Sequence, residues 1–446
     1  MSIFDGKRLD NDTFKLDIDR MRRGWYTDKY FVNISAMLSA LAAEGYRYPS
    51  PKESAGLIPK EEVASGDLEV EMQLFARREG ATVIVGVDKA LTMLKHCTGY
   101  WEGDKFVETA DRLQVWALQD GALIHGTNNP LQIEPVMRIR GRYRDFAILE
   151  TPMLGILTRS SRVATNVLEA LIAAHGKPLL FFPARFDLHE VQAADGYAYQ
   201  IAVQRFNKDY SNTLGAFIST DAQGDWWGGS GGGTVAHAAI TCFLGDTAEA
   251  MLAFARVLLP SISRIALVDF NNDCISDSLS VCKAMFDNYR QMISQGNEVE
   301  ADRFKLYGVR LDTSASLRDQ GIPPLGDPKL DLGVTPRLVI AVRQALDDAW
   351  KSWDLPVIWQ EPAQKFCQEV KIVVSGGFNP ERIARFEKLS VPVDIYAVGS
   401  ALFDNHGSTV TDFTADVVRV KINGEWQDLA KVGRKAIDNP AFERVW

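Results

Sequence analysis

The sequence lacks the segments by which membrane proteins, nucleic-acid-binding proteins and zinc proteins are commonly recognised. No uninterrupted apolar stretch reaches the length of about 20 residues that a membrane span requires. No long Lys/Arg run is present and the net charge is −9, so neither a nucleic acid nor an anionic membrane is an expected partner. The cysteines form no CxxC pair and no Cys/His cluster, which argues against a zinc site.

Cysteine is also scarce, with five residues at scattered positions (Cys97, Cys242, Cys274, Cys282 and Cys367). We expect them to be buried thiols in a reducing cytosol. The opening residues MSIFDGKRLDND contain no apolar segment of the kind found in signal peptides, so the predicted location is cytoplasmic. A chain of 446 residues with 46% apolar residues can bury a large core without disulfide bonds.

The first region, residues 1–140, is predicted to form an α+β domain with an antiparallel or mixed sheet. Its segment YFVNISAMLSALAAEG has apolar residues at helical spacing. Strand-like runs separated by turn signals follow at LEVEMQLFARR, ATVIVGV, LQVWALQDGALIHG and LQIEPVMRIRG. The last region, residues 406–446, contains the strand-like run VVRVKING and is expected to pack against the first region.

The middle region, residues 141–405, alternates short apolar strands with amphipathic helices. A helix is predicted from Leu149 to His175, with Gly176 as its C-cap. Strands are predicted at PLLFFPARFD, RIALVD, FKLYGVRLD, VKIVVSGG and DIYAVGS, and further helices at HEVQAADGYAYQIAVQRF, AITCFLGDTAEAMLAFARVL, CISDSLSVCKAMFDNYRQMI, TPRLVIAVRQALDDAW and PERIARFEKL. This alternation is typical of parallel βα units that are buried on both faces. It favours an α/β barrel, and the absence of GxGxxG after the first strand argues against a Rossmann domain.

Polar and glycine-rich residues follow the predicted barrel strands. Active sites of βα barrels form at the carboxyl ends of the strands, so these residues are the candidates for chemistry. They are Arg185, Thr234, His237, Asp269, Arg310, Asp312, Ser375-Gly376-Gly377 and Gly399-Ser400.

The two glycine turns predict a phosphate site. Turns at residues 375–377 and 399–400 leave backbone N–H groups uncovered, and such groups bind phosphate at barrel mouths. The alternative is a tight turn in which glycine is needed only for a positive φ. Their position on consecutive strands favours phosphate.

Arg310 and Asp312 lie two residues apart on one strand and therefore point to the same face. An Arg can clamp a diphosphate, and an Asp can accept hydrogen bonds from ribose hydroxyls or hold Mg²⁺. The alternative is a buried ion pair that closes the barrel. Asp269 is a similar candidate, and His237, after Gly231-Gly232-Gly233-Thr234, is either a structural or a catalytic histidine.

Four motifs, GGTVAHAAI, VRLDT, IVVSGGF and DIYAVGSALF, together resemble those of the nicotinate phosphoribosyltransferases, which are type II phosphoribosyltransferases. The resemblance is closest to the archaeal-type branch, where VRLDT is followed by a Ser/Arg-containing stretch, as in VRLDTSASLRDQG. RRGWYTDKYF, IEPVMRIRG and LETPMLGIL also resemble family segments, so the likeness runs from about residue 20 to the end.

The resemblance implies an irregular βα barrel with a second α+β sheet domain formed from N- and C-terminal segments. It implies a homodimer or higher homo-oligomer with a site shared between subunits. The implied reaction of NAD biosynthesis joins nicotinate to 5-phosphoribosyl 1-pyrophosphate and gives nicotinate mononucleotide and pyrophosphate. ATP, a co-substrate, is hydrolysed through a phosphohistidine, Mg²⁺ is required, and no organic prosthetic group is implied.

The matching motif positions imply roles for individual residues. His237 would be the phosphorylated histidine and would act with Arg310 and Asp312, while Asp312 and Asp269 would hold Mg²⁺. The base would be bound by Tyr30 reaching across from the second subunit, together with Phe182, Arg185, Ser211 and Asn212. The ribose and phosphate groups would be bound by Asp269, Ser375, Gly376, Gly377, Gly399 and Ser400.

The sequence departs from the family pattern near the base pocket. Pro183 stands where the family usually has Gly, and Phe186 where a second basic residue is common. In VDFNND, Asn272 or Asp273 would stand in for a carboxylate, and the Trp/Gly-rich segment 221–233 is unusually long.

Four other functions are weighed against this one. A nicotinamide phosphoribosyltransferase, or one for another pyridine base, would prefer an acidic residue at Asn212. Quinolinate phosphoribosyltransferases are shorter and have no equivalent of His237. A sugar-phosphate lyase or aldolase would need a Lys or a metal triad at the barrel mouth, whereas Lys371 and Lys305 open their strands. An inactive sensor protein would not need the His237, Arg310 and Asp312 set.

Overall fold

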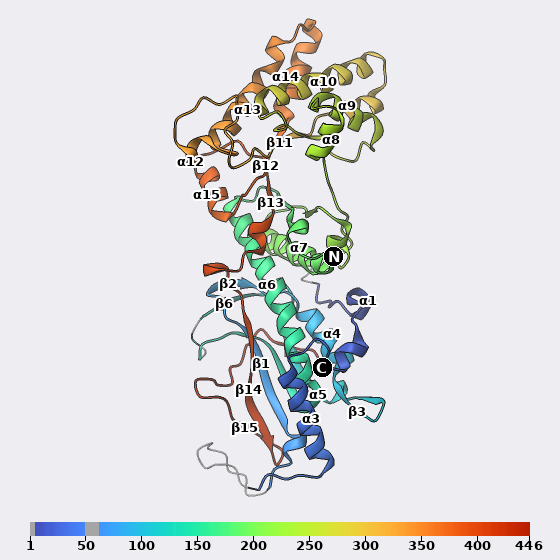
Figure 1. Cartoon of the computed structure of the whole chain (residues 1–446), viewed down its shortest axis with the longest axis vertical. Helices are drawn as coiled ribbons and strands as arrows, with labels where there is room; N and C mark the ends of the chain where they lie inside the picture. The colour runs from blue at the N-terminus through green and yellow to red at the C-terminus, as the bar shows by residue number, and fades with distance from the viewer. Residues whose placement is uncertain (1–4, 50–61, 128, 130) are drawn as a thin grey trace.

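The computed structural model describes residues 5–49, 62–127, 129 and 131–446. The molecule is elongated, with an antiparallel sheet towards one end and a parallel sheet towards the other (Figure 1). The long helix α6 (Glu150–Ala173) runs between them. No helix among these residues combines the length and apolar character needed to cross a bilayer.

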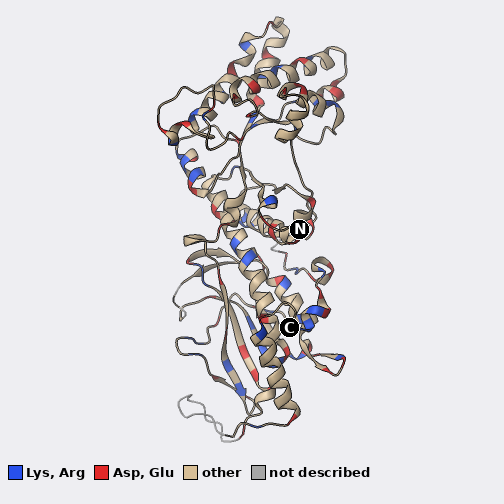
Figure 2. Ribbon diagram, viewed as in Figure 1, with Lys and Arg blue, Asp and Glu red and all other residues tan. Residues whose placement is uncertain are grey.

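The antiparallel sheet is assembled from both ends of the chain. Its strand order is β15-β14-β1-β7-β5-β16, with β1 (Glu69–Ala76), β5 (Gln114–Ala117), β7 (Pro135–Arg142), β14 (Phe413–Ile422), β15 (Glu425–Asp428) and β16 (Glu443–Arg444). The central pairing of β1 with β14 confirms the predicted sheet of N- and C-terminal segments. Ion pairs such as Lys421–Glu69 and Arg419–Glu71 cross this pairing, where both signs of charge meet (Figure 2).

Shorter elements surround this sheet. They are the helices α1 (Asn11–Phe14), α2 (Ile18–Arg22), α3 (Lys29–Ala43), α4 (Val87–Cys97) and α5 (Tyr143–Phe146), and two strand pairs, β2 (Gly80–Val83) with β6 (Leu123–Gly126) and β3 (Gly99–Glu102) with β4 (Lys105–Glu108). Helix α3 matches the predicted N-terminal helix. Helix α4 and the β3–β4 hairpin were not predicted; α4 packs its buried Leu91 and Leu94 into the core beneath the sheet.

The second sheet is entirely parallel and lies in the middle region. Its order is β10-β11-β12-β13-β8-β9, with β8 (Leu179–Phe181), β9 (Phe217–Ile218), β10 (Ile265–Leu267), β11 (Gly308–Leu311), β12 (Lys371–Val374) and β13 (Ile395–Val398). The sheet curls into a half-barrel, which confirms the expected irregular barrel. Its strands are short and largely buried, as parallel strands covered on both faces must be.

Helices cover the half-barrel. In chain order they are α6, α7 (Gln192–Asp209), α8 (His237–Cys242), α9 (Thr247–Val257), α10 (Cys274–Ser294), α11 (Glu298–Ala301), α12 (Pro328–Asp331), α13 (Pro336–Asp348), α14 (Val357–Glu369) and α15 (Pro380–Lys388). The single helix predicted over AITCFLGDTAEAMLAFARVL is wrong. The backbone takes a positive φ at Leu244 and Gly245, which ends α8 before Asp246 caps α9.

Helix α6 belongs to both parts of the molecule. It contacts β2, β14 and α4 on one side and α7, α15 and the turn at residues 400–403 on the other. Because α6 packs in both hydrophobic cores, its contacts do not divide the chain into separate domains. The domain boundaries at residues 140 and 405 therefore stay predictions.

Candidate active site

A cavity of about 670 Å³ opens at the carboxyl ends of the parallel strands. Its walls come from the segments that follow β8, β9, β11, β12 and β13. Parallel strands place their carboxyl ends on one edge, so residues distant in the sequence meet there. The predicted site residues that line it are Phe182, Arg185, Thr234, His237, Arg310, Asp312, Ser375, Gly376, Gly377, Gly399 and Ser400.

His237 lies at the edge of the cavity, where it begins α8, and is paired with Asp269 at the end of β10. The Nε2 atom of His237 is 2.9 Å from Oδ1 of Asp269. The imidazole is half-exposed and the carboxyl group is nearly buried. Burial raises the pKa of the Asp269 carboxyl, and the hydrogen bond with His237 acts in the opposite direction. Because Asp269 engages Nε2, Nδ1 is the ring nitrogen left for chemistry.

Arg310 brings a partly uncompensated charge to the cavity. Burial lowers the pKa of its guanidinium, Asp312 and Asp269 oppose this shift, and nearby Arg185 adds to it. The Nε atom has no hydrogen-bond partner among the described residues. Its Nη2 atom donates a long hydrogen bond of 3.4 Å to the carbonyl oxygen of Val235. A buried cation with an unused donor suits an anionic ligand, because an unpaired donor costs free energy.

The turn after β12 is joined to Asp312. The Ser375 hydroxyl donates to Asp312 Oδ1 at 2.8 Å. Gly376 and Gly377 both have positive φ values, so the need for glycine in a tight turn applies here as well. Arg382 of α15 donates to the Gly376 carbonyl oxygen at 2.6 Å, which fixes the turn just before that helix begins. The turn is thus held rigidly while its glycines remain exposed in the cavity.

Aromatic residues after β8 also line the cavity. The guanidinium of Arg310 lies 5.9 Å from the Phe182 ring, and that of Arg185 lies 5.3 Å from the Phe186 ring. Phe186 packs on the turn after β13, since a Cβ atom added at Gly399 would lie 2.7 Å from its Cε2 atom. This side of the cavity therefore combines flat apolar faces with two guanidinium groups.

Comparisons with known proteins identify the fold. Residues 61–161 match the family model described as the quinolinate phosphoribosyl transferase, N-terminal domain. The nicotinate-nucleotide pyrophosphorylase of Pyrococcus furiosus superposes with a TM-score of 0.63 at 24% identity, over 96% of this chain and 85% of that one. Human nicotinic acid phosphoribosyltransferase superposes with a TM-score of 0.56 at 17% identity, over 88% and 74% of the respective chains. The chain has a phosphoribosyltransferase fold. The resemblance seen in the motifs is confirmed at this level, and the archaeal-type branch stays a prediction.

Three predicted base-binding residues lie outside the cavity. Tyr30 is 56% exposed on α3, in the part of the molecule that holds the antiparallel sheet. Ser211 and Asn212 follow α7, and the Asn212 side chain lies beside Gly176, which precedes β8. They therefore lie near the amino ends of β8 and β9, at the opposite edge of the sheet from the cavity.

The carboxylate substitutes suggested for the VDFNND segment are used for structure. Asp273 caps α10, accepting from the Ser276 backbone N–H at 3.0 Å and from its hydroxyl. Asn272 has a positive φ and donates to the Arg318 carbonyl oxygen at 3.0 Å. Neither lines the cavity.

Sequence reasoning missed several residues that line the cavity. Ser219 follows β9, a strand of two residues that was not predicted. Gln223 fixes it by accepting from the Ser219 backbone N–H at 2.9 Å, which gives the Trp/Gly-rich segment a structural role. Asp404 lines the cavity beyond Ser400. The polar pair Ser219-Thr220 after the apolar residues 216–218 was the available signal for this strand end.

Proposed function

We propose that the protein is a pyridine-base phosphoribosyltransferase whose substrate is nicotinate. It would transfer the phosphoribosyl group of 5-phosphoribosyl 1-pyrophosphate to the ring nitrogen and release pyrophosphate. The observation that carries the proposal is the single cavity in which His237 (paired with Asp269), Arg310 and Asp312 face two glycine turns. The fold shared with a nicotinic acid phosphoribosyltransferase supports it.

The sugar-phosphate half of the reaction follows from the turns and charges. Backbone N–H groups of the turns at 376–377 and 399–400, with the start of α15, would bind the 5′-phosphate. Asp312 would accept hydrogen bonds from the ribose hydroxyls. Arg310 would bind the diphosphate and stabilise the negative charge that grows as it leaves C1.

Asp312 in the cavity and Asp269 beside His237 are donors that fit a magnesium ion. The described residues contain no cluster of three or more His, Cys, Asp or Glu side chains suited to a metal. Mg²⁺ is commonly held by one or two carboxylates together with substrate phosphates, and Asp312 and Asp269 are close enough to interact electrostatically. When bound, the ion would offset charge on the diphosphate.

The base would lie against Phe182, with Arg185 facing its carboxylate. Stacking contributes about 0.5–1.5 kcal/mol per aromatic pair, so it mainly orients the ring nitrogen for attack on C1. A guanidinium favours an acid over an amide, which is why we propose nicotinate over nicotinamide. Tyr30 of a second copy of this chain would cover the outer face of the ring.

His237 would couple the reaction to ATP. Its Nδ1 atom would attack the γ-phosphorus of ATP, ADP would leave, and water would later cleave the N–P bond. Asp269, which engages Nε2, would orient the imidazole and stabilise the positive charge that it gains. His237→Ala should therefore abolish the stimulation by ATP while slow transfer from nicotinate persists.

Product formation with three bases tests the proposal. Purified protein with Mg²⁺ and radiolabelled phosphoribosyl pyrophosphate should form a nucleotide from nicotinate, and faster with ATP. Turnover with nicotinamide but not nicotinate would make the base assignment wrong. The match of residues 61–161 to the quinolinate family makes quinolinate a second candidate, which release of carbon dioxide would reveal. ATP stimulation that survives in His237→Ala would contradict the phosphohistidine.

A further inference from the structure

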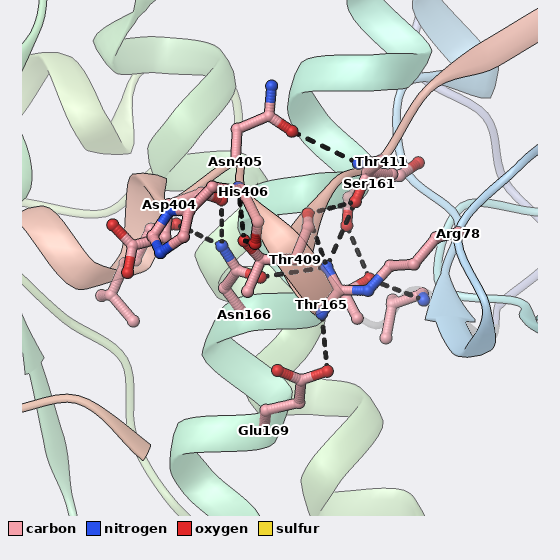
Figure 3. A network of polar contacts seen from close by, with 12 residues as sticks. Arg78, Ser161, Thr165, Asn166, Glu169, Asp404, Asn405, His406, Thr409 and Thr411 are labelled. Atoms are coloured by element: carbon pink, nitrogen blue, oxygen red, sulfur yellow. Dashed lines mark hydrogen bonds and ion pairs between the residues drawn. The ribbon is translucent and has the colours of Figure 1, made fainter. Parts of the chain in front are cut away.

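A buried arginine joins three distant parts of the chain beside the cavity. Arg78 lies between β1 and β2 and is 2% exposed. Its Nη1 atom donates to Asn166 Oδ1 on α6 at 3.0 Å and to Thr411 Oγ1 at 3.1 Å. Its Nη2 atom forms a 2.6 Å ion pair with Glu169, one turn along α6 (Figure 3). These contacts compensate for the removal of the guanidinium from water.

Asn166 connects Arg78 to the turn that lines the cavity. Its Nδ2 atom donates to the carbonyl oxygens of Leu402 at 3.2 Å and Asp404 at 3.0 Å. Those two residues end the turn that begins at Gly399, and Gly399, Ser400 and Asp404 all line the cavity. The buried amide is fully used, with its oxygen accepting from Arg78 and its nitrogen donating to the turn.

The guanidinium decides which way the amide faces. The oxygen and nitrogen of an amide have nearly the same shape, but only the oxygen can accept from Arg78. The Nδ2 group must then point towards the two carbonyl oxygens. Arg78 also holds Thr411, whose backbone N–H donates to Asn405 Oδ1 at 3.3 Å. The connection from β13 to β14 is therefore anchored at Thr411 by Arg78, and at Leu402 and Asp404 by Asn166.

We propose that Arg78 and Asn166 are positioning residues for the 399–404 turn. Through the amide of Asn166, Arg78 sets the backbone of this turn before a phosphate arrives, so that little ordering remains to be done on binding. The inference rests on the proposed function, because it assigns the turn to the 5′-phosphate. It adds that Arg78 of the N-terminal region, acting through Asn166 of α6, controls affinity for the sugar phosphate without touching it.

Asn166→Asp tests this role and retains the shape of the side chain. One oxygen still accepts from Arg78, while the other replaces the donor and faces the carbonyl oxygens of Leu402 and Asp404. Thr411→Val is a milder second variant that removes one partner of Arg78. Ser161→Ala is the matched control, since the buried Ser161 hydroxyl bonds to the backbone of Val85 and lies one to two turns away on the same helix.

Two measurements are made on all three variants. Hydrogen–deuterium exchange should become faster in peptides spanning 399–404 for Asn166→Asp, less so for Thr411→Val, and remain unchanged for Ser161→Ala. The Kd for ribose 5-phosphate, measured by calorimetry, should rise about tenfold in Asn166→Asp, as expected for the loss of strong buried hydrogen bonds. The KM for nicotinate should change less than about twofold, which corresponds to about 0.4 kcal/mol of binding free energy, because the 399–404 turn is not assigned to the base.

The possible failures are distinguishable. Unchanged exchange at 399–404 in Asn166→Asp, with normal ribose 5-phosphate binding by the wild-type protein, overturns the positioning role alone. A second outcome also overturns the role: in Asn166→Asp the Kd for ribose 5-phosphate and the KM for nicotinate rise by the same factor, and Ser161→Ala shows the same rises. The effect would then be one of general stability. A wild-type protein that binds no ribose 5-phosphate overturns the proposed function and, with it, the phosphate assignment of the turn.

Discussion

Asp120 is a buried carboxyl group outside the proposed active site. Its Oδ1 atom accepts from the Val87 backbone N–H at 2.8 Å, and its Oδ2 atom from the Tyr197 hydroxyl at 3.3 Å. Burial and the nearby Asp88 carboxylate raise the pKa of Asp120 well above that of an exposed aspartic acid. The folded protein therefore holds a proton on Asp120 at pH values where the unfolded chain has released it.

Because of this proton, the contribution of Asp120 to stability decreases as the pH rises. Since folding raises the pKa of Asp120 to about 8, the contribution of this group to the free energy of unfolding is lost as the pH rises from about 3.9, the ordinary pKa of Asp, to about 8. Asp120→Asn removes the titration and keeps an acceptor for Val87. We expect the Tm of the variant to fall less than that of wild type between acidic and mildly alkaline pH, measured by calorimetry. Asp104→Asn on an exposed turn is the control; parallel Tm curves for wild type and Asp120→Asn would contradict the prediction.

The site residues that sequence reasoning placed together share one property. They lie at the ends of strands that could be recognised from apolar runs: Arg310 lies within VRL, Asp312 follows VRL directly, and Ser375 follows IVV. Parallel topology then brings them to one edge. Ser211 and Asn212 did not fit this rule, because the next strand begins only at Phe217 and has two residues. The hydrogen bonds of Arg78 and Asn166 leave no pattern in the sequence at all.

Elements were predicted well where periodicity was long and poorly where it was interrupted. Helix α10 has 21 residues and was foreseen, whereas α14 carries Pro362 in its interior and was not. Helices α8 and α9 were predicted as one helix, although Gly245, which has a positive φ, and the N-cap residue Asp246 lie at the break between them. The half-barrel was expected from alternating strands and helices, but its irregularity followed only from the family resemblance.

The turn after β13 is fitted to the ring of Phe186. Because a Cβ atom on Gly399 would lie 2.7 Å from that ring, Gly399→Ala must displace the ring or the turn. We expect the Kd of ribose 5-phosphate to rise about tenfold in Gly399→Ala. The double variant Gly399→Ala/Phe186→Ala should recover part of this loss in calorimetry, because the clash is removed.

Phe186→Ala alone provides the reference for that comparison. A double variant as weak as Gly399→Ala would show that the backbone angles of Gly399 (φ −113°, ψ −112°), and not the ring, require glycine there. Glycine would then be required at position 399 by backbone conformation and not by packing against Phe186.

At the scale of the whole molecule, Tyr30 is far from the cavity of its own chain, so the proposed shared site requires a second copy. Arg310→Ala should be inactive, and Tyr30→Ala should have a kcat/KM for nicotinate about tenfold below wild type. Co-expression of the two differently tagged chains pairs an intact cavity with an intact Tyr30 in mixed dimers. Activity of about a quarter of wild type is expected from random pairing. Mixed dimers no more active than Tyr30→Ala alone would place Tyr30 outside the site.

The pairing of β1 with β14 can form only near the end of protein synthesis. Glu69 meets Lys421, a residue 352 positions later in the chain. The whole half-barrel is synthesised between the two strands, so β1 pairs on one side with β7 and keeps its other edge open until nearly the last codons are read. Open strand edges attract other chains. A premature stop before residue 413 would therefore release a nearly complete chain that aggregates through β1.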